Sequence, residues 1–345
     1  MPVVVPAVML SKHHRARERA RTGTWIVPRA PTHECSRPDR CPASIGTGGG
    51  GAPPNTGGPP VGPRADAHRP LPCFPVRLID AHGHLNADRF ADDVGAVIER
   101  ARQAGVERLL VPGWNVASSE RALALAERHP WLDASVGVHP HDAAKVGDAA
   151  WASIARWARD DRVVAVGETG LDFDRVFSPI DAQLENLRRN LALAVETGKP
   201  AILHCRSRRG ARDAQDRLLE EVAAVPGVAV VIHSFSGPVD YAHATLDLGA
   251  AISVSGLAFR RGEESTAQVA AIVPADRLLV ETDSPFLTPP GAPRGRNEPE
   301  WVRLTADWVR ALRGDDARTF GDQLVAAYDR TFPRDRARPA DPLAD

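Results

Sequence analysis

From Arg77 onward, short apolar runs of five to seven residues alternate with longer stretches in which apolar residues recur at helical spacing. The short runs are rich in Val, Ile and Leu without strict alternation, which is typical of strands buried on both faces. We expect strands at 77–81, 107–113, 133–139, 162–168, 200–205, 228–234, 250–256 and 277–283. We expect helices at 92–104, 117–128, 149–159, 182–197, 211–223, 239–247, 263–272, 300–312 and 318–330.

Eight strands, each followed by a helix, predict an α/β fold of the (β/α)₈ TIM-barrel type. An open, doubly wound parallel sheet is the structural alternative. Such a sheet normally carries a Gly-rich phosphate-binding turn after its first strand, and the segment AHGHLN at that point is not one. The pattern therefore favours the closed barrel.

The pattern starts only after a long segment of different composition. Residues 1–75 include GTGGGGAPPNTGGPPVGPR, which is rich in Gly and Pro and holds too few apolar residues to build a core. We expect a disordered Pro/Gly/Arg-rich arm at 1–75, a barrel domain at 76–332 and a flexible tail at 333–345. An alternative for the arm is that translation begins near Val76.

Composition and charge restrict the class of protein. The chain is 43% hydrophobic and 25% charged, which is ordinary for a soluble globular protein. No apolar run reaches the roughly 18 residues of a membrane span, and the four cysteines are scattered, so we expect a cytoplasmic protein. Residues 1–75 hold ten of the 43 basic and four of the 44 acidic residues, which leaves 33 against 40 in residues 76–345. Any binding of nucleic acid must therefore come from a local basic patch.

Polar residues of metal-binding type recur where the expected strands end. In TIM barrels these ends meet on one face, which carries the active site. His82 and His84 share one side of the first strand, because side chains alternate with a period of two. The other members are His139, with His141 just beyond it, Glu168, His204, His233 and Asp283.

Such a set of buried imidazoles and carboxylates would be costly without a counter-charge, and divalent metal ions satisfy it. Six ligands are too many for one tetrahedral zinc but suit two metal ions that share a carboxylate. Glu168 is the natural bridge. His82, His84 and Asp283 would complete one ion, and His204 and His233 the other. Mixed nitrogen and oxygen ligands favour Zn²⁺ or Mn²⁺ over Mg²⁺.

The segments LIDAHGHLN, GVHPHDA, VGETGLDFDR, ILHCR, HSFSG, ISVSG, ETDSPFLTP and RGRNEP follow one another in unbroken order. This series resembles the motifs of the TatD family of metal-dependent hydrolases, over residues 76 to about 332. The resemblance implies a TIM barrel of the metal-dependent hydrolase type. By motif position it also implies that the metal ligands are His82, His84, Glu168, His204, His233 and Asp283.

The chain departs from the family pattern at a few positions. Gly83 and Asn86 stand where the first motif usually has Cys and Asp, and Ser234 stands where Cys is usual. None of these changes removes a ligand, so they bear on substrate preference rather than on metal binding.

The resemblance implies a deoxyribonuclease, and we expect a phosphodiester hydrolase of the 3′–5′ exonuclease type that acts on DNA single strands or ends. Two metal ions would activate the attacking water. Asp283 would be both a ligand and the general base. Glu281, two residues earlier, would orient Asp283 or the water, or serve the structure alone. We expect a monomer without an obligate protein partner.

Substrate contacts are expected from residues that follow strand ends on the same face. Arg206, Arg260 and Arg294 follow the fifth, seventh and eighth strands, where they can bind phosphate without regard to base sequence. Solvated loop arginines are the alternative. His139 and His141 would contact the phosphate or support the metal ligands.

Two other functions stay open. An amidohydrolase acting on amides, lactones or phosphotriesters often bridges its metals with a carboxylated lysine after the fourth strand, where this chain has Glu168. Neither Lys145 nor Lys199 lies at a strand end, which disfavours that function. The other alternative is a non-catalytic metal-binding barrel that binds nucleic acid or a protein.

Overall fold

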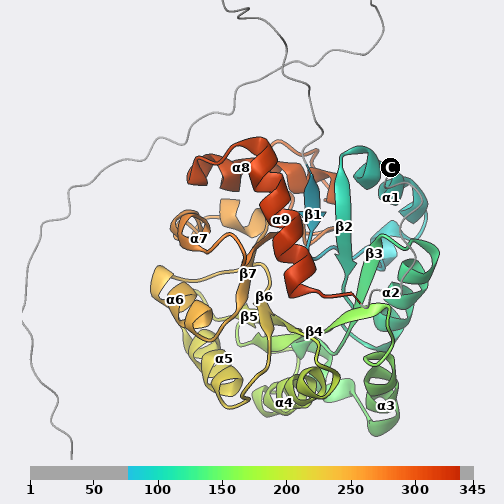
Figure 1. The fold of residues 1–345 in the computed structure, drawn as a ribbon. Helices are drawn as coiled ribbons and strands as arrows, with labels where there is room; N and C mark the ends of the chain where they lie inside the picture. The colour runs from blue at the N-terminus through green and yellow to red at the C-terminus, as the bar shows by residue number, and fades with distance from the viewer. Residues whose placement is uncertain (1–76, 335–345) are drawn as a thin grey trace, which may run out of the picture. The chain divides into compact units, whose positions relative to one another are not determined.

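Eight parallel strands follow one another in sequence order around one sheet (Figure 1). The computed structural model describes residues 77–334; the expected arm at 1–75 and residues 335–345 of the expected tail lie outside them. The strands are β1 (Leu78–Asp80), β2 (Val106–Val111), β3 (Leu132–Val136), β4 (Val163–Asp172), β5 (Ala201–Arg206), β6 (Val230–Ile232), β7 (Ala251–Val254) and β8 (Leu278–Val280).

The last strand returns to the first. The backbone N–H of Ala81, just after β1, donates to the carbonyl of Val280 in β8 at 2.9 Å, and the N–H of Asp283 donates to the carbonyl of His82 at 2.8 Å. Together with the unbroken order from β1 to β8, these bonds complete a ring of strands. The TIM barrel expected from the sequence is confirmed.

Helices cover the outside of the ring, one or more after each strand (Figure 1). They are α1 (Val94–Gln103), α2 (Val116–Arg128), α3 (Asp148–Trp157), α4 (Ile180–Thr197), α5 (Asp213–Ala223), α6 (Val239–Asp247), α7 (Thr266–Ile272), α8 (Val302–Arg313) and α9 (Ala317–Thr331). Short 3₁₀ helices lie at Asp88–Phe90, Pro140–Lys145, Gly256–Phe259 and Pro299–Trp301. Among the described residues, none of the helices has the length and apolar character needed to cross a membrane.

The helices pack through one apolar side, as their sequence period predicts. On α8, Val302, Ala306 and Val309 are spaced by four and three residues, and all three are buried. Local signals fix where helices begin: the side chain of Asn115 accepts the backbone N–H of Ser118 at the start of α2, and Asp316 does the same for α9.

Strand β4 is longer than the sequence predicted. It continues four residues past Glu168 to Asp172, and all ten of its residues are buried. Glycine permits this extension: Gly170 has φ 132°, and a Cβ on it would lie 2.0 Å from the carbonyl oxygen of His204. The close approach keeps β4 paired with β5, with Gly170 opposite His204. It also brings Asp172 onto the same face of the barrel as Glu168.

Candidate metal centre

The residues expected at strand ends meet around the carboxylate of Glu168, which is buried. Its Oε2 lies 3.4 Å from Nε2 of His82 and 3.7 Å from Nε2 of His84. Its Oε1 lies 3.0 Å from Nε2 of His233 and 3.3 Å from Nδ1 of His204. Glu168 therefore presents one oxygen to each of two groups of histidines.

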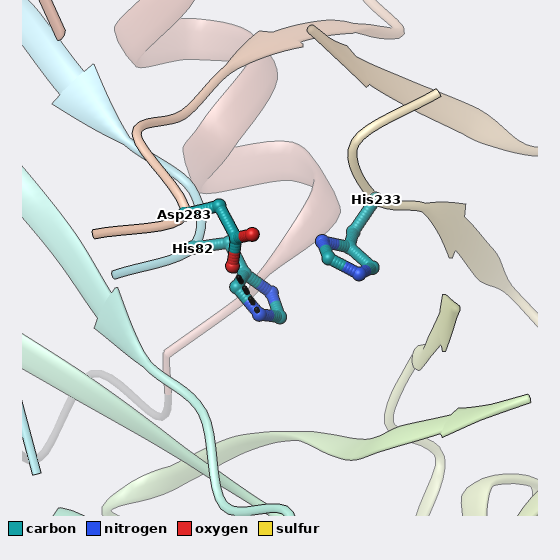
Figure 2. A group of neighbouring side chains, drawn as sticks. All are labelled: His82, His233 and Asp283. Atoms are coloured by element: carbon teal, nitrogen blue, oxygen red, sulfur yellow. Dashed lines mark ion pairs between the residues drawn. The ribbon is translucent and has the colours of Figure 1, made fainter. Parts of the chain in front are cut away.

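The first group consists of His82, His84, Asp283 and Oε2 of Glu168. The Nε2 atoms of the two histidines are 3.2 Å apart, and Oδ1 of Asp283 lies 3.2 Å from His84 and 3.9 Å from His82. Figure 2 shows the side chains of His82, Asp283 and His233 directed into a common space between the strand ends. One atom from each of these three side chains falls within 4.8 Å of the others.

The second group consists of His139, His204, His233 and Oε1 of Glu168. Ligand atoms of His139, Glu168 and His204 lie within 4.8 Å of one another. Nε2 of His233 is 3.4 Å from Nδ1 of His204, and Nε2 of His139 is 3.3 Å from Oε1 of Glu168. The sequence predicted that His139 contacts the phosphate or supports the metal ligands, and the structure places it beside Glu168 and His204.

The orientation of His139 differs from that of its neighbours. Its Nδ1 accepts the backbone N–H of His141 at 3.1 Å. Burial lowers the pKa of His139 to about 4, so the ring is neutral at neutral pH. In a neutral ring with an accepting Nδ1, the proton resides on Nε2. His139 therefore offers an N–H donor to the site, whereas a metal ligand requires a free lone pair.

Carboxylates hold two of the histidines from outside. Oε1 of Glu281 lies 3.2 Å from Nδ1 of His233 and also accepts the backbone N–H and the hydroxyl of Ser234, at 2.8 and 2.7 Å. The sequence had suggested that Glu281 orients Asp283 or the water, or serves the structure alone; its closest partners here are His233 and Ser234. Oδ2 of Asp172 lies 2.7 Å from Nε2 of His141 and 3.7 Å from Nε2 of His204.

Sequence reasoning missed Asp172 and Asp80. Asp172 stands four residues after Glu168 on the same face of β4, a period-two signal that extending the strand would have revealed. Asp80 precedes His82 by two residues. Its carboxylate accepts the backbone N–H and the hydroxyl of Thr282, at 2.9 and 2.6 Å, and thereby ties β1 to the segment that carries Asp283.

The charges of the site balance one another. Burial alone would raise the pKa of Glu168, but His139 and His233 outweigh that effect and hold its pKa well below the ordinary value. Burial would likewise lower the pKa of His233, yet Glu168 and Glu281 raise it well above its ordinary value. The same interaction with His233 lowers the pKa of Glu281 to about 2, against the opposing effect of burial. The carboxylates are thus anionic and attract cations.

This donor set fits divalent metal ions. Imidazole nitrogens face one another and share the two oxygens of one carboxylate: Nε2 of His82 and of His84 lie near Oε2 of Glu168, and Nε2 of His233 and Nδ1 of His204 lie near Oε1. A cation between the donors would satisfy the nitrogens that face inward. The arrangement fits a metal-dependent hydrolase, with ligands of the kind that Zn²⁺ and Mn²⁺ accept.

The expected arginines lie in different surroundings. The guanidinium of Arg206 is bonded to Asp174 at 2.9 Å. Arg260 and Arg294 line an open hollow of about 470 Å³ together with Phe259, Thr288 and the segment 289–292. Within residues 77–334, neither of these two guanidiniums has an ion pair. They are therefore available to a phosphate, whereas Arg206 would first have to leave Asp174.

Known proteins are similar in sequence to this chain over the whole barrel. The profile of the family described as TatD related DNase matches residues 79–333. A protein of *Erwinia tasmaniensis* named 3′–5′ ssDNA/RNA exonuclease TatD is 37% identical over 264 residues, which cover 74% of this chain and 99% of that protein. An uncharacterized metal-dependent hydrolase of Bacillus subtilis, YabD, is 36% identical over 68% of this chain and 91% of its own length.

A solved structure shares the fold. The crystal structure of YJJV, a TatD homolog from Escherichia coli K12, superimposes with a TM-score of 0.69 at 31% sequence identity. The match covers 75% of this chain and 99% of that one. The likeness therefore extends over the strands and loops that carry the candidate metal centre.

Proposed function

The chain belongs to the TatD-related DNase family of metal-dependent hydrolases, and from that premise we propose that it shortens single-stranded nucleic acid from the 3′ end. Similar proteins named as 3′–5′ ssDNA/RNA exonucleases support this direction and substrate. DNA is the first candidate substrate, because the family is described as a DNase family.

The observation that carries the proposal is the position of Glu168 between two groups of histidines. Two divalent ions would share its carboxylate, one held also by His82, His84 and Asp283, the other by His204 and His233. Bound there, the ions would lower the pKa of water and stabilise the charge that develops on the phosphate. Zn²⁺ or Mn²⁺ suits these ligands better than Mg²⁺.

Asp283 is the proposed general base. Its Oδ1 lies 3.2 Å from Nε2 of His84, at the open side of the first group, and its side chain is more exposed than that of Glu168. The backbone fixes it there, because its N–H is bonded to the carbonyl of His82. A carboxylate held next to both the attacking water and the phosphate can take up the proton that the water releases.

His139 is proposed to bind the scissile phosphate. Its Nε2–H points into the second group, where a non-bridging phosphate oxygen would lie, and the backbone of His141 holds the ring in place. A fixed donor of this kind stabilises charge that develops during attack. His141 lies beside it with Nε2 occupied by Asp172, which leaves Nδ1 for the substrate.

Arginines along the loops would bind the backbone of the strand. Arg260 and Arg294 are the principal candidates because they line the same hollow and hold no carboxylate. Arg206 joins them if a phosphate replaces Asp174 as its partner. Guanidinium–phosphate contacts depend on charge and not on the bases, in keeping with an enzyme that reads no sequence.

The amidohydrolase alternative finds little support in the site. A carboxylated lysine at the bridge would have to come from the position in β4 that Glu168 occupies. Lys199 lies elsewhere, with Nζ donating to the carbonyls of Ala158 and Asp160 at 2.8 Å. A phosphodiesterase with a carboxylate bridge therefore accounts for the geometry better.

The test uses the full chain. The protein is stripped with a chelator and supplied with Zn²⁺, Mn²⁺ or Mg²⁺, and cleavage of 5′-labelled single-stranded DNA is followed over time beside an Asp283→Asn variant. A ladder that shortens one nucleotide at a time, only with metal and not in the variant, supports the proposal. Bound metal without cleavage of DNA or RNA would refute the substrate assignment.

A further inference from the structure

Two exposed phenylalanines stand at the mouth of the candidate metal centre. The described residues include eight large hydrophobic side chains that are exposed, and only Phe177 and Phe286 among them are aromatic. Phe177, between β4 and α4, is 68% exposed, and Phe286, just after β8, is 51% exposed. Removing apolar surface from water is favourable in proportion to its area, so a ligand that covers such a ring gains free energy of binding.

Both rings contact histidines of the site, from different sides. The ring of Phe177 lies edge to face with His141, with centroids 4.7 Å apart. The ring of Phe286 lies edge to face with His84 at 6.0 Å. His141 belongs with Asp172 beside the second group, and His84 belongs to the first. The two phenylalanines therefore flank the place where a scissile phosphate would lie.

The loop that carries Phe286 also leads to the basic hollow. It runs from Asp283 through Phe286 to Thr288, which lines the hollow with Arg260 and Arg294. It is fixed in place, because Gly256 lies so close to Leu287 that a Cβ on the glycine would lie 1.7 Å from the Leu287 carbonyl oxygen. An exposed ring thus lies on the loop that leads from the candidate metal centre to the hollow lined by two guanidiniums.

On the basis of the proposed function, we infer that Phe177 and Phe286 are stacking surfaces for unpaired bases on either side of the bond that is cut. Stacking on a protein ring tolerates every base, because each base has a π-face. Two rings on either side of one phosphate also require the neighbouring bases to part from each other, which the stacking of a paired duplex opposes. The two phenylalanines would then select single strands, while the arginines supply attraction to phosphate of any kind.

Binding can be measured apart from cleavage. The metal-free full chain is titrated against a fluorescent oligothymidylate and against an abasic strand of equal length, and fluorescence anisotropy gives the Kd for each. The variants are Phe177→Ala and Phe286→Ala, with Phe286→Trp to restore a ring. Val195→Ala serves as control, since Val195 is an exposed apolar residue near the far end of α4.

We expect the wild type to prefer oligothymidylate to the abasic strand. Each alanine variant should weaken oligothymidylate binding about tenfold, with little change for the abasic strand. Phe286→Trp and Val195→Ala should keep the preference. Equal Kd values for both strands in the wild type, or alanine variants that bind oligothymidylate as the wild type does, would overturn the inference. Base-dependent binding without metal-dependent cleavage would instead refute the proposed function and leave the stacking surfaces standing.

Discussion

The carboxylate of Glu281 lies 3.2 Å from Nδ1 of His233, on the other side of the imidazole from Glu168. Because Glu281 accepts the proton of Nδ1, Nε2 is the nitrogen that would give up its proton and offer a lone pair to a metal ion in the second group. Ser234 fixes the carboxylate in turn, through its backbone N–H and its hydroxyl. The second group is therefore oriented by hydrogen bonds that do not depend on an ion.

Replacing Glu281 by Gln should weaken the binding of the second metal ion without removing any side chain that would coordinate it. The amide lacks the charge that favours the Nδ1 proton, so we expect metal affinity to fall by about 10- to 100-fold. Zinc titration of the stripped protein against a competing chelator measures this. Glu107→Gln is the matched control, since Glu107 pairs with Arg77 at the surface. Equal zinc affinity in both variants would contradict the role given to Glu281.

His139 and His204 should respond differently to the same substitution. His204→Gln removes a ligand, so we expect one ion per chain to be lost. His139→Gln replaces a donor held by the His141 backbone with a flexible amide, so we expect both ions to remain and kcat to fall about 100-fold. Elemental analysis of the purified variants, together with their cleavage rates, separates the two roles. Loss of metal in His139→Gln would show that His139 binds the ion directly.

Arg294 and Arg296 are two residues apart, but replacing them should affect different properties: DNA binding for Arg294 and stability for Arg296. Arg294 lines the hollow, so Arg294→Gln should raise the Kd for single-stranded DNA and reduce the slope of log K against log salt by about 0.7. Arg296 is bonded to both carboxylate oxygens of Asp93 at 2.7 Å and to Glu298. Arg296→Gln should therefore lower the unfolding midpoint and leave the salt slope unchanged. The reverse pattern would contradict the assignment of the hollow to phosphate.

The sequence could predict the barrel and the histidines that gather around Glu168, because both follow from periodicity. Alternating apolar runs and helical stretches specify eight strands, and residues at strand ends must converge on one face. His82, His84 and Asp283 illustrate this, because the position of a strand in the barrel is enough to place the residues that follow it on the face that carries the site. The sequence did not predict the length of β4. This strand ends four residues later than expected, because Gly170 lets the backbone pass close to His204.

Roles that depend on a second partner could not be read from the chain. The donor character of His139 arises from the backbone N–H of His141, which the local 3₁₀ helix turns toward the ring. Arg206 and Arg294 look equivalent in sequence, and only the position of Asp174 in space distinguishes them. Such contacts join residues whose spacing in the sequence does not follow the period of a helix or a strand, so the sequence pattern does not predict them.

Stability should depend on pH through Glu221, a residue of α5 whose carboxylate pairs with Arg188 of α4. It is 7% exposed and bonded to Arg188 at 2.7 and 2.8 Å and to Arg217 at 2.7 Å. The hydrogen bonds from Arg188 lower its pKa below the ordinary 4.5, against burial. A lowered folded-state pKa stabilises above pH 4.5, and this contribution is lost as the pH falls further.

Glu221→Gln should accordingly lower the free energy of unfolding by about 2 kcal/mol at pH 7. The difference from the wild type should shrink once the pH falls below about 4.5. Urea unfolding at several pH values measures it. A difference that grows toward acid pH would contradict the assigned direction of the pKa shift.

The most direct test of the central claim is a stepwise return of Mn²⁺ to the stripped full chain while nucleotide release from single-stranded DNA is measured. Two ions sharing Glu168 predict that activity rises mainly with the second equivalent, and that Glu168→Gln stays inactive at every equivalent. Full activity after one equivalent, or cleavage without metal, would contradict the account.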